Sequence, residues 1–147
     1  MSADELVYTR TVSAPRPFVF ACLTEPRHLA AFWGPAGTTT PLDRIIVEAR
    51  PGGRFETLII NDADGSTHHM QAVFDKVDPQ HTLSWTETDT GMTTTMTFTD
   101  ADTDRTEIRI HQHHVPDALR RPDAQNGFQS SLDRFEDYLH TSDQKDT

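Results

Sequence analysis

Histidines are the first side chains of this sequence whose type and spacing could do chemistry. His68 and His69 are adjacent, and His111, His113 and His114 lie close together in a later segment. Imidazoles from two neighbouring strands can hold zinc in a tetrahedral site. Adjacent residues of a strand point to opposite faces, so neither adjacent pair can hold one ion, and only His111 and His113 share a face. Because no cysteine lies nearby and no HExxH-like spacing occurs, we expect no metal and no cofactor.

Nucleophilic and acid–base chemistry has no recognisable pattern in this chain. Cys22 falls on the apolar side of an expected short helix, where a buried thiol is inert. Ser84 and Ser130 have no neighbouring base in a known catalytic arrangement. Carboxylates such as Glu87 and Asp89 occupy the ends of expected strands, where we expect them to lie in solvent. We therefore assign no catalytic residue.

Two arginines, Arg50 and Arg54, flank the turn sequence Pro51-Gly52-Gly53. They can serve only to anchor the turn. Alternatively, an arginine at the mouth of a cleft can bind a ligand carboxylate through two parallel hydrogen bonds. The sequence leaves both interpretations open.

Alternating apolar residues indicate a small-molecule cleft. Residues two apart in a strand share a face, and segments 68–74, 92–98 and 108–112 each place apolar side chains on one face. Flexible methionines, aromatic rings and a few polar groups are typical of ligand sites. The same side chains can instead be ordinary core filling, which remains the alternative for each of them. The predicted ligand-binding residues are Trp33, Phe55, His68, Met70, Phe74, Trp85, Met96, Phe98, Ile110, Gln112, Phe128 and Leu132.

The elements that must position this cleft are a strand, two short helices, six further strands and a long helix. The first strand spans 6–12. Ser13 and Thr24 are each followed two residues later by proline, which predicts two helix starts with these side chains as N-caps. Further strands are expected at 45–49, 54–60, 67–77, 81–88, 92–99 and 103–113. The short turns between them indicate antiparallel pairing.

The last helix begins at Asp117 or Asp123 and carries one apolar stripe. Its members recur at spacings of four, three and four: Phe128, Leu132, Phe135 and Leu139. Gly127 within this helix costs about 1 kcal/mol relative to alanine, so we expect it to allow close approach to the sheet or to Trp33. A sheet with one striped helix predicts an α+β body of two layers, with the helix across one face.

Length and charge exclude several classes of function. The 147 residues fit one domain, expected over 1–140, with a polar and flexible tail over 141–147. Thirteen basic and 23 acidic residues give a net charge of −10, which repels a phosphate backbone, so nucleic acid is not an expected partner. No apolar run approaches the about 20 residues that cross a bilayer, so we expect no membrane partner. A single cysteine and no signal segment predict a cytoplasmic location.

Several short motifs follow one another in an order that resembles a known bacterial family. They are Arg10-x-x-x-Ala14-Pro15-x-x-x-Val19-Phe20, Thr24-x-Pro26, Trp33-Gly34-Pro35, Pro51-Gly52-Gly53-x-Phe55, Asp64-Gly65, Phe74-x-x-Val77-x-Pro79, Leu83-x-Trp85, Phe98 and Gly127-Phe128-x-x-x-Leu132. Together they resemble the activator of Hsp90 ATPase homologue 1-like family, from Leu6 to His140. The resemblance implies the START/Bet v 1-like helix-grip fold of the SRPBCC superfamily. In that fold a curved antiparallel sheet, here of about seven strands, wraps a long C-terminal helix and leaves a cavity.

Three classes of function follow from the cleft and the resemblance. We expect a protein that binds a small hydrophobic or amphipathic molecule, its specific role unassigned. START-like relatives suggest, as an alternative, a polyketide cyclase/dehydratase-like enzyme in which His68, Gln112 and Trp85 orient the substrate. The resemblance to the Hsp90 activator suggests, as a second alternative, a co-chaperone-like stress-response module.

A homodimer is a further expectation. Phe32 and Trp33 precede a Gly-Pro loop, and an exposed apolar pair there could be covered in a two-fold interface. The alternative is that Trp33 folds over the mouth of the cavity.

Overall fold

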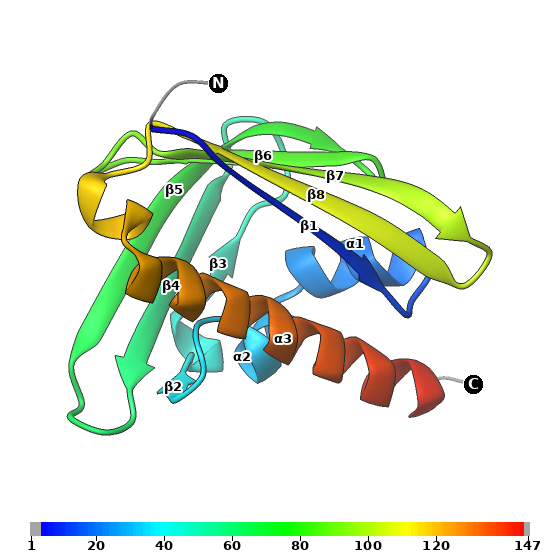
Figure 1. The fold of residues 1–147 in the computed structure, drawn as a ribbon, viewed down its shortest axis with the longest axis horizontal. Helices are drawn as coiled ribbons and strands as arrows, with labels where there is room; N and C mark the ends of the chain where they lie inside the picture. The colour runs from blue at the N-terminus through cyan, green and yellow to red at the C-terminus, as the bar shows by residue number, and fades with distance from the viewer. Residues whose placement is uncertain (1–3, 146–147) are drawn as a thin grey trace.

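A curved sheet, two short helices and one long helix make up the protein (Figure 1). The structure is a computed structural model that describes residues 4–145, with side chains as far as Thr141. In chain order the elements are β1 (Leu6–Val12), α1 (Arg16–Thr24), α2 (Pro26–Phe32), β2 (Thr38–Thr39), the 3₁₀ turn η1 (Leu42–Arg44), β3 (Ile46–Val47), β4 (Arg54–Asn61), β5 (Thr67–Asp78), β6 (Thr82–Glu87), β7 (Thr93–Asp102), β8 (Arg105–His113), the 3₁₀ turn η2 (Asp117–Arg120) and α3 (Pro122–Lys145).

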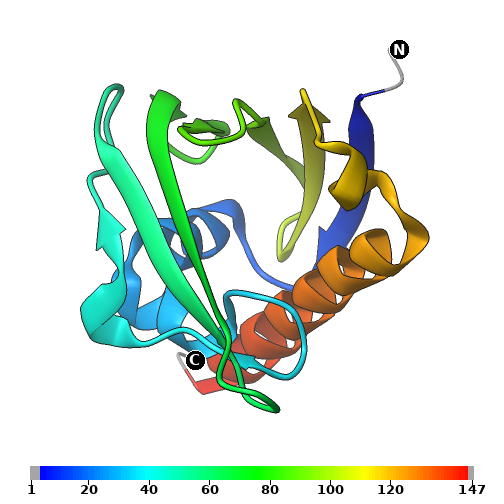
Figure 2. The same cartoon turned by 90° about the vertical axis from the view of Figure 1, so that its left-hand side faces the viewer.

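The sheet is antiparallel throughout, in the order β1-β8-β7-β6-β5-β4-β2, and β3 also pairs with β4. Strands β4 to β8 lie beside their chain neighbours, as their short connecting turns require. The register between β5 and β6 shifts between Phe74 and Lys76, and such a bulge bends the strand that carries it. Figure 2 shows the sheet curling over the space above α3.

The predicted α+β helix-grip architecture is confirmed, with differences at the ends of elements. The sheet has eight strands because β2, which has only two residues, pairs with the end of β4. Two residues are too few to show any periodicity in the sequence. Strand β7 continues through the expected turn as far as Asp102, since Asp100 pairs with Thr106 and Asp102 with Arg105. The two short helices follow β1 as expected, and α3 starts at Pro122, beside the predicted start at Asp123, whereas Asp117 begins the separate turn η2.

The N-caps of the two short helices differ from the prediction. Pro15 and Glu25 occupy the cap positions, and neither helix has a side-chain cap hydrogen bond. Ser13 is exposed outside α1, and the Thr24 hydroxyl donates to the carbonyl of Phe20, within α1 itself. The caps predicted at Ser13 and Thr24 are therefore wrong, because the prolines start each helix one or two residues later. These helices depend on buried apolar side chains rather than on capping.

The turn before β4 has a backbone that only glycine accommodates. Gly52 has a φ of 83°, and a Cβ on Gly53 would lie 2.0 Å from the carbonyl oxygen of Glu48. The Gly52 N–H donates to the Phe74 carbonyl, and the Phe74 N–H donates to the Gly53 carbonyl. The turn is thereby fixed to the centre of β5.

Helix α3 crosses the concave side of the sheet. Of its predicted stripe, Leu132, Phe135 and Leu139 are buried, and Phe128 packs against the core. The helix continues to Lys145, and residues 146 and 147 lie outside the described part of the chain. Flexibility of the tail at 141–147 therefore stays a prediction. Among the described residues no helix is both long enough and apolar enough to span a membrane.

Candidate functional site

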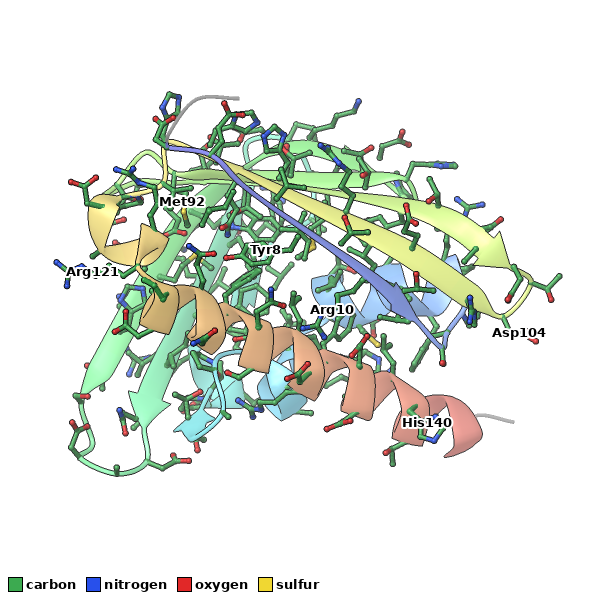
Figure 3. The ribbon with its side chains drawn as sticks, viewed as in Figure 1. Tyr8, Arg10, Met92, Asp104, Arg121 and His140 are labelled. Carbon is green, nitrogen blue, oxygen red and sulfur yellow. The ribbon has the colours of Figure 1, made fainter. Side chains whose placement is uncertain are left out.

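A cavity of about 430 Å³ lies between the concave face of the sheet and α3. Its volume falls within the range of about 300–1,000 Å³ that is usual for small-molecule sites. Figure 3 shows Tyr8 pointing from β1 into the space above α3. Most of the wall is apolar, and its polar members are Tyr8, His68, Glu87, Thr90, Thr94, Gln112 and Ser131.

The structure brings most of the predicted ligand-binding residues to this cavity. The predicted residues in its wall are Trp33, His68, Met70, Trp85, Met96, Gln112, Phe128 and Leu132. Those outside its wall are Phe55, Phe74, Phe98 and Ile110. Alternation along the strands places all the strand members on the concave face, but that face is longer than the cavity.

The four residues outside the wall belong to the packed core. The Phe55 and Phe74 rings stack, with centroids 5.2 Å apart and planes 9° apart, and both meet the ring of Trp85. Trp85 therefore stands between these two rings and the cavity. Phe98 packs edge-on against Phe20 of α1. Ile110 borders a separate void of about 10 Å³, which has room for one water at most.

Trp33 forms part of the cavity wall rather than an exposed patch. Its indole N–H donates to the Thr57 hydroxyl at 3.2 Å, and its ring contacts those of Phe55 and Trp85. Phe32 is buried and stacks on Phe135 of α3, with ring centroids 4.6 Å apart. The exposed apolar pair on which the homodimer prediction rests is therefore not present, and the alternative position of Trp33 at the cavity is the one observed.

Five polar side chains of the wall form no side-chain hydrogen bond in the described part of the chain: Tyr8, His68, Glu87, Thr94 and Gln112. No fully buried side-chain nitrogen or oxygen among the described residues lacks a partner, so the polar atoms of these five side chains are accessible from the cavity. They therefore have unused hydrogen-bonding capacity for a ligand. Burial raises the pKa of Tyr8. The sequence does contain a signal for Tyr8, because it lies four residues before the apolar Val12 and therefore shares the inward face of β1.

Glu87 is the carboxyl group whose environment departs furthest from the sequence expectation. We expected it in solvent at a strand end, but it is half-buried in the cavity wall. Burial, with a smaller contribution from the charge of Asp89, raises the pKa of Glu87 to about 7. The expectation fails because β6 ends beneath the cavity rather than at the molecular surface. Asp89, two residues later, is exposed as expected.

The described residues of the cavity wall include the carboxyl group of Glu87 and the imidazole of His68 but no lysine or arginine. Arg54 lies on the outer face of β4, where its Nε donates to Glu56 at 2.8 Å. Arg50 lies 3.8 Å from Glu48. The interpretation of these arginines as anchors of the turn therefore fits, and the ligand-carboxylate interpretation does not.

Gly127 also differs from its expected role. A Cβ added there would meet nothing within 4 Å, and the residue lines the cavity. Close approach of the helix to the sheet is therefore not its purpose, because the first turns of α3 stand away from the sheet. The space left at Gly127 belongs to the cavity.

The histidines are divided between the two faces of the sheet. His68 lines the cavity, whereas His69 lies on the outer face, 3.7 Å from Glu56. His111 and His113 lie together with Glu5, and the potential ligand atoms of these three residues are within 4.8 Å of one another. Glu5 was not among the residues that the sequence singled out.

Comparisons with known proteins identify one matching family model and many similar folds. The family model described as "Activator of Hsp90 ATPase homolog 1-like protein" matches residues 13–140. A crystal structure from Chromobacterium violaceum has a TM-score of 0.83 at 24% identity, covering 92% of this chain and 96% of that chain. An AHSA1-like protein from Aeromonas hydrophila, solved by NMR, has a TM-score of 0.80 at 18% identity, covering 94% and 93%. The search of curated proteins finds no match. The likeness to the solved structures supports the helix-grip fold.

Proposed function

This chain belongs to the activator of Hsp90 ATPase homologue 1-like family, whose START-like fold is a ligand-binding fold, and from that premise we propose that it binds a small hydrophobic or amphipathic molecule. The cavity of about 430 Å³ carries the proposal. Its wall joins an apolar surface to polar groups that lack protein partners. Such a combination suits a ligand with an apolar body and a few hydrogen-bonding atoms.

The apolar body of the ligand contacts Trp33, Met70, Trp85, Met96, Phe128 and Leu132. Methionine adapts its shape to an irregular ligand because its side chain is unbranched and flexible. Gln112 and His68 supply hydrogen bonds to the polar end. The predicted residues outside the wall, such as Phe55 and Phe74, support Trp85 from behind and have no direct contact with the ligand.

The charge of the wall favours a neutral or basic ligand. An anionic ligand would have to leave water without a lysine or arginine to compensate its charge, and burying an unpaired charge is costly. A neutral ligand avoids that penalty, and a basic one can pair with the Glu87 carboxylate.

Binding is tested with a neutral dye, Nile red, and with Met96→Trp. The indole fills part of the cavity, so dye binding should fall strongly while the melting temperature changes little. Thr97→Trp is the matched control, because Thr97 is the next residue of β7 and lies on the opposite face of the sheet. This control should bind dye like the parent protein. Native mass spectrometry of the purified protein additionally detects a ligand that co-purifies.

Two results contradict the proposal. One is a parent protein that neither binds the dye nor carries any co-purified molecule. The other is a large drop in the melting temperature of Met96→Trp, since overpacking of a filled core costs about 1–3 kcal/mol. Either result means that the space is closed in solution.

The enzyme and co-chaperone alternatives have less support. His68, Gln112 and Trp85 all line the cavity, and their places there suit ligand contact as well as they suit catalysis. The co-chaperone alternative rests on the family name.

The single cysteine, Cys22, is buried, and the expected cytoplasmic location stays a prediction.

A further inference from the structure

We propose that Glu5, His111 and His113 form a zinc site on the outer face of the sheet, independent of the cavity. His111 and His113 are two residues apart on β8, so both imidazoles project from the same face. Gln112, between them, points to the opposite side and lines the cavity. Glu5 immediately precedes β1, which pairs with β8 in a register that sets Val7 opposite His111. The strand pairing therefore brings together residues more than 100 positions apart.

The distances fit a tetrahedral ion with little rearrangement. The Glu5 Oε1 lies 2.7 Å from His111 Nε2 and 3.3 Å from His113 Nδ1. The centroids of the two imidazole rings are 3.9 Å apart. Zinc bonds of about 2.0–2.1 Å to nitrogen place neighbouring tetrahedral ligands about 3.3 Å apart. One contact already has this length, and the other has to lengthen by only about half an ångström.

The chemistry of the three ligands selects the ion. Two imidazoles and one carboxylate suit zinc and neighbouring transition metals, whereas magnesium and calcium prefer oxygen ligands. The side chains of Glu5, His111 and His113 are 18%, 23% and 40% exposed. They are thus held by their surroundings yet remain accessible, and the fourth position of the ion can be filled by water.

Two of the other histidine–carboxylate pairs on the protein offer a comparison. His69 lies 3.7 Å from Glu56 on the same outer face, and His114 lies 3.6 Å from Asp4. Each pair contains one imidazole and one carboxylate. Neither is part of a cluster of three ligand atoms in the described region of the chain. The pair at His69 is therefore a natural control for the cluster.

Zinc at this position would join the edge strand β1 to its neighbour β8. An ion that binds the folded protein and not the unfolded chain raises stability by mass action. This proposal revises the expectation of no metal, which considered histidines and cysteines as ligands and did not include a carboxylate from a paired strand.

The experiment uses the full chain without a histidine tag, stripped with a chelator and dialysed. Isothermal titration calorimetry with zinc chloride should show one ion bound per chain. The melting temperature of the protein should rise with zinc concentration. His113→Ala should weaken zinc binding about tenfold or more. Even the loss of a residue that only hydrogen-bonds to a metal ligand lowers metal affinity about 10–100-fold. His69→Ala should bind zinc like the parent.

A second variant keeps the test decisive if His113→Ala folds poorly. Glu5→Gln retains the shape of the side chain and one acceptor oxygen but removes its charge, and circular dichroism checks that it is folded. It should also weaken zinc binding about tenfold or more. Absence of a zinc-dependent rise in melting temperature overturns the proposal. Equal losses of zinc affinity in His69→Ala and Glu5→Gln overturn it as well.

Discussion

Arg10 of β1 and Glu136 of α3 form an ion pair, with Arg10 Nη1 lying 3.0 Å from Glu136 Oε2. The same nitrogen lies 2.8 Å from Asp133 Oδ1, and Nη2 donates to the side chain of Gln129 at 2.7 Å. One guanidinium thus joins three side chains of α3 to the first strand, and Figure 3 labels Arg10 on β1. Since α3 forms one wall of the cavity, this contact helps to set the distance between that wall and the sheet.

Replacing Arg10 by methionine should therefore affect both stability and binding. Arg10→Met keeps a long side chain but removes the charge, and we expect a loss of about 1–2 kcal/mol, reduced by the exposure of Asp133. Dye affinity should fall too, because α3 is less firmly held. Arg16→Met is the control, since Arg16 pairs with Asp100 away from α3. Urea denaturation and dye titration check the prediction, and equal dye affinity in the two variants would contradict it.

Glu87 should make stability depend on pH. Because burial raises its pKa to about 7, the folded protein keeps a proton that the unfolded chain releases above its ordinary value of 4.5. The stability that this proton provides is present below about pH 4.5 and is lost as pH rises through about 7. Glu87→Gln cannot lose a proton. It should therefore gain in melting temperature relative to the parent between pH 4 and pH 8, and a difference that stays constant over this range would refute the buried position of Glu87.

Two glycines should respond to alanine in opposite directions. At Gly127 an added Cβ meets nothing, so Gly127→Ala should stabilise the protein by up to about 1 kcal/mol through helix propensity. At Gly53 the same Cβ would lie 2.0 Å from the Glu48 carbonyl oxygen, so Gly53→Ala should destabilise it. Thermal melting of both variants decides the matter. A loss of stability in Gly127→Ala would show that α3 packs more closely on the sheet than described.

Replacing Gln112 and replacing Thr106 should affect stability differently, because the Thr106 side chain has a hydrogen-bonding partner and the Gln112 side chain has none among the described residues. The Thr106 hydroxyl is fully buried and donates to the Ala14 carbonyl at 2.7 Å. Thr106→Val leaves that carbonyl unpaired and should cost about 1–3 kcal/mol. Gln112→Leu removes an amide that has no partner among the described residues, so stability should be unchanged or slightly higher. Urea denaturation measures both, and an equal loss would mean that Gln112 is hydrogen-bonded in solution.

The sequence was sufficient to predict that the chosen strand residues share the concave face of the sheet. A strand alternates strictly, so once Phe74 is inward, Met70 must be inward as well. The sequence did not predict which residues on that face line the cavity and which lie in the packed core. Phe55 and Phe74 share the face of Met70 but lie behind Trp85, and this depends on how far α3 stands from the sheet. No local pattern records that distance.

Contacts between distant segments were the other part that sequence patterns missed. Glu5 meets His111 only because β1 pairs with β8, and the two residues are 106 positions apart. Glu87 was misjudged for a similar reason. A strand end is usually exposed, but the segment Thr90–Met92 and the start of α3 lie around this one.

The two outer strands of the sheet differ greatly in length, and this bears on self-association. A sheet that stays open around a cavity has unpaired N–H and C=O groups along its margins, which invite pairing with strands of another molecule. At one margin β2 and β3 have only two residues each, too short to template such a pairing. At the other margin, β1 lies beside α3 (Figure 2), and its Arg10 donates a hydrogen bond to Asp133 of that helix. With a net charge of −10 keeping molecules apart, the protein can maintain an open interior at high concentration without forming intermolecular sheets.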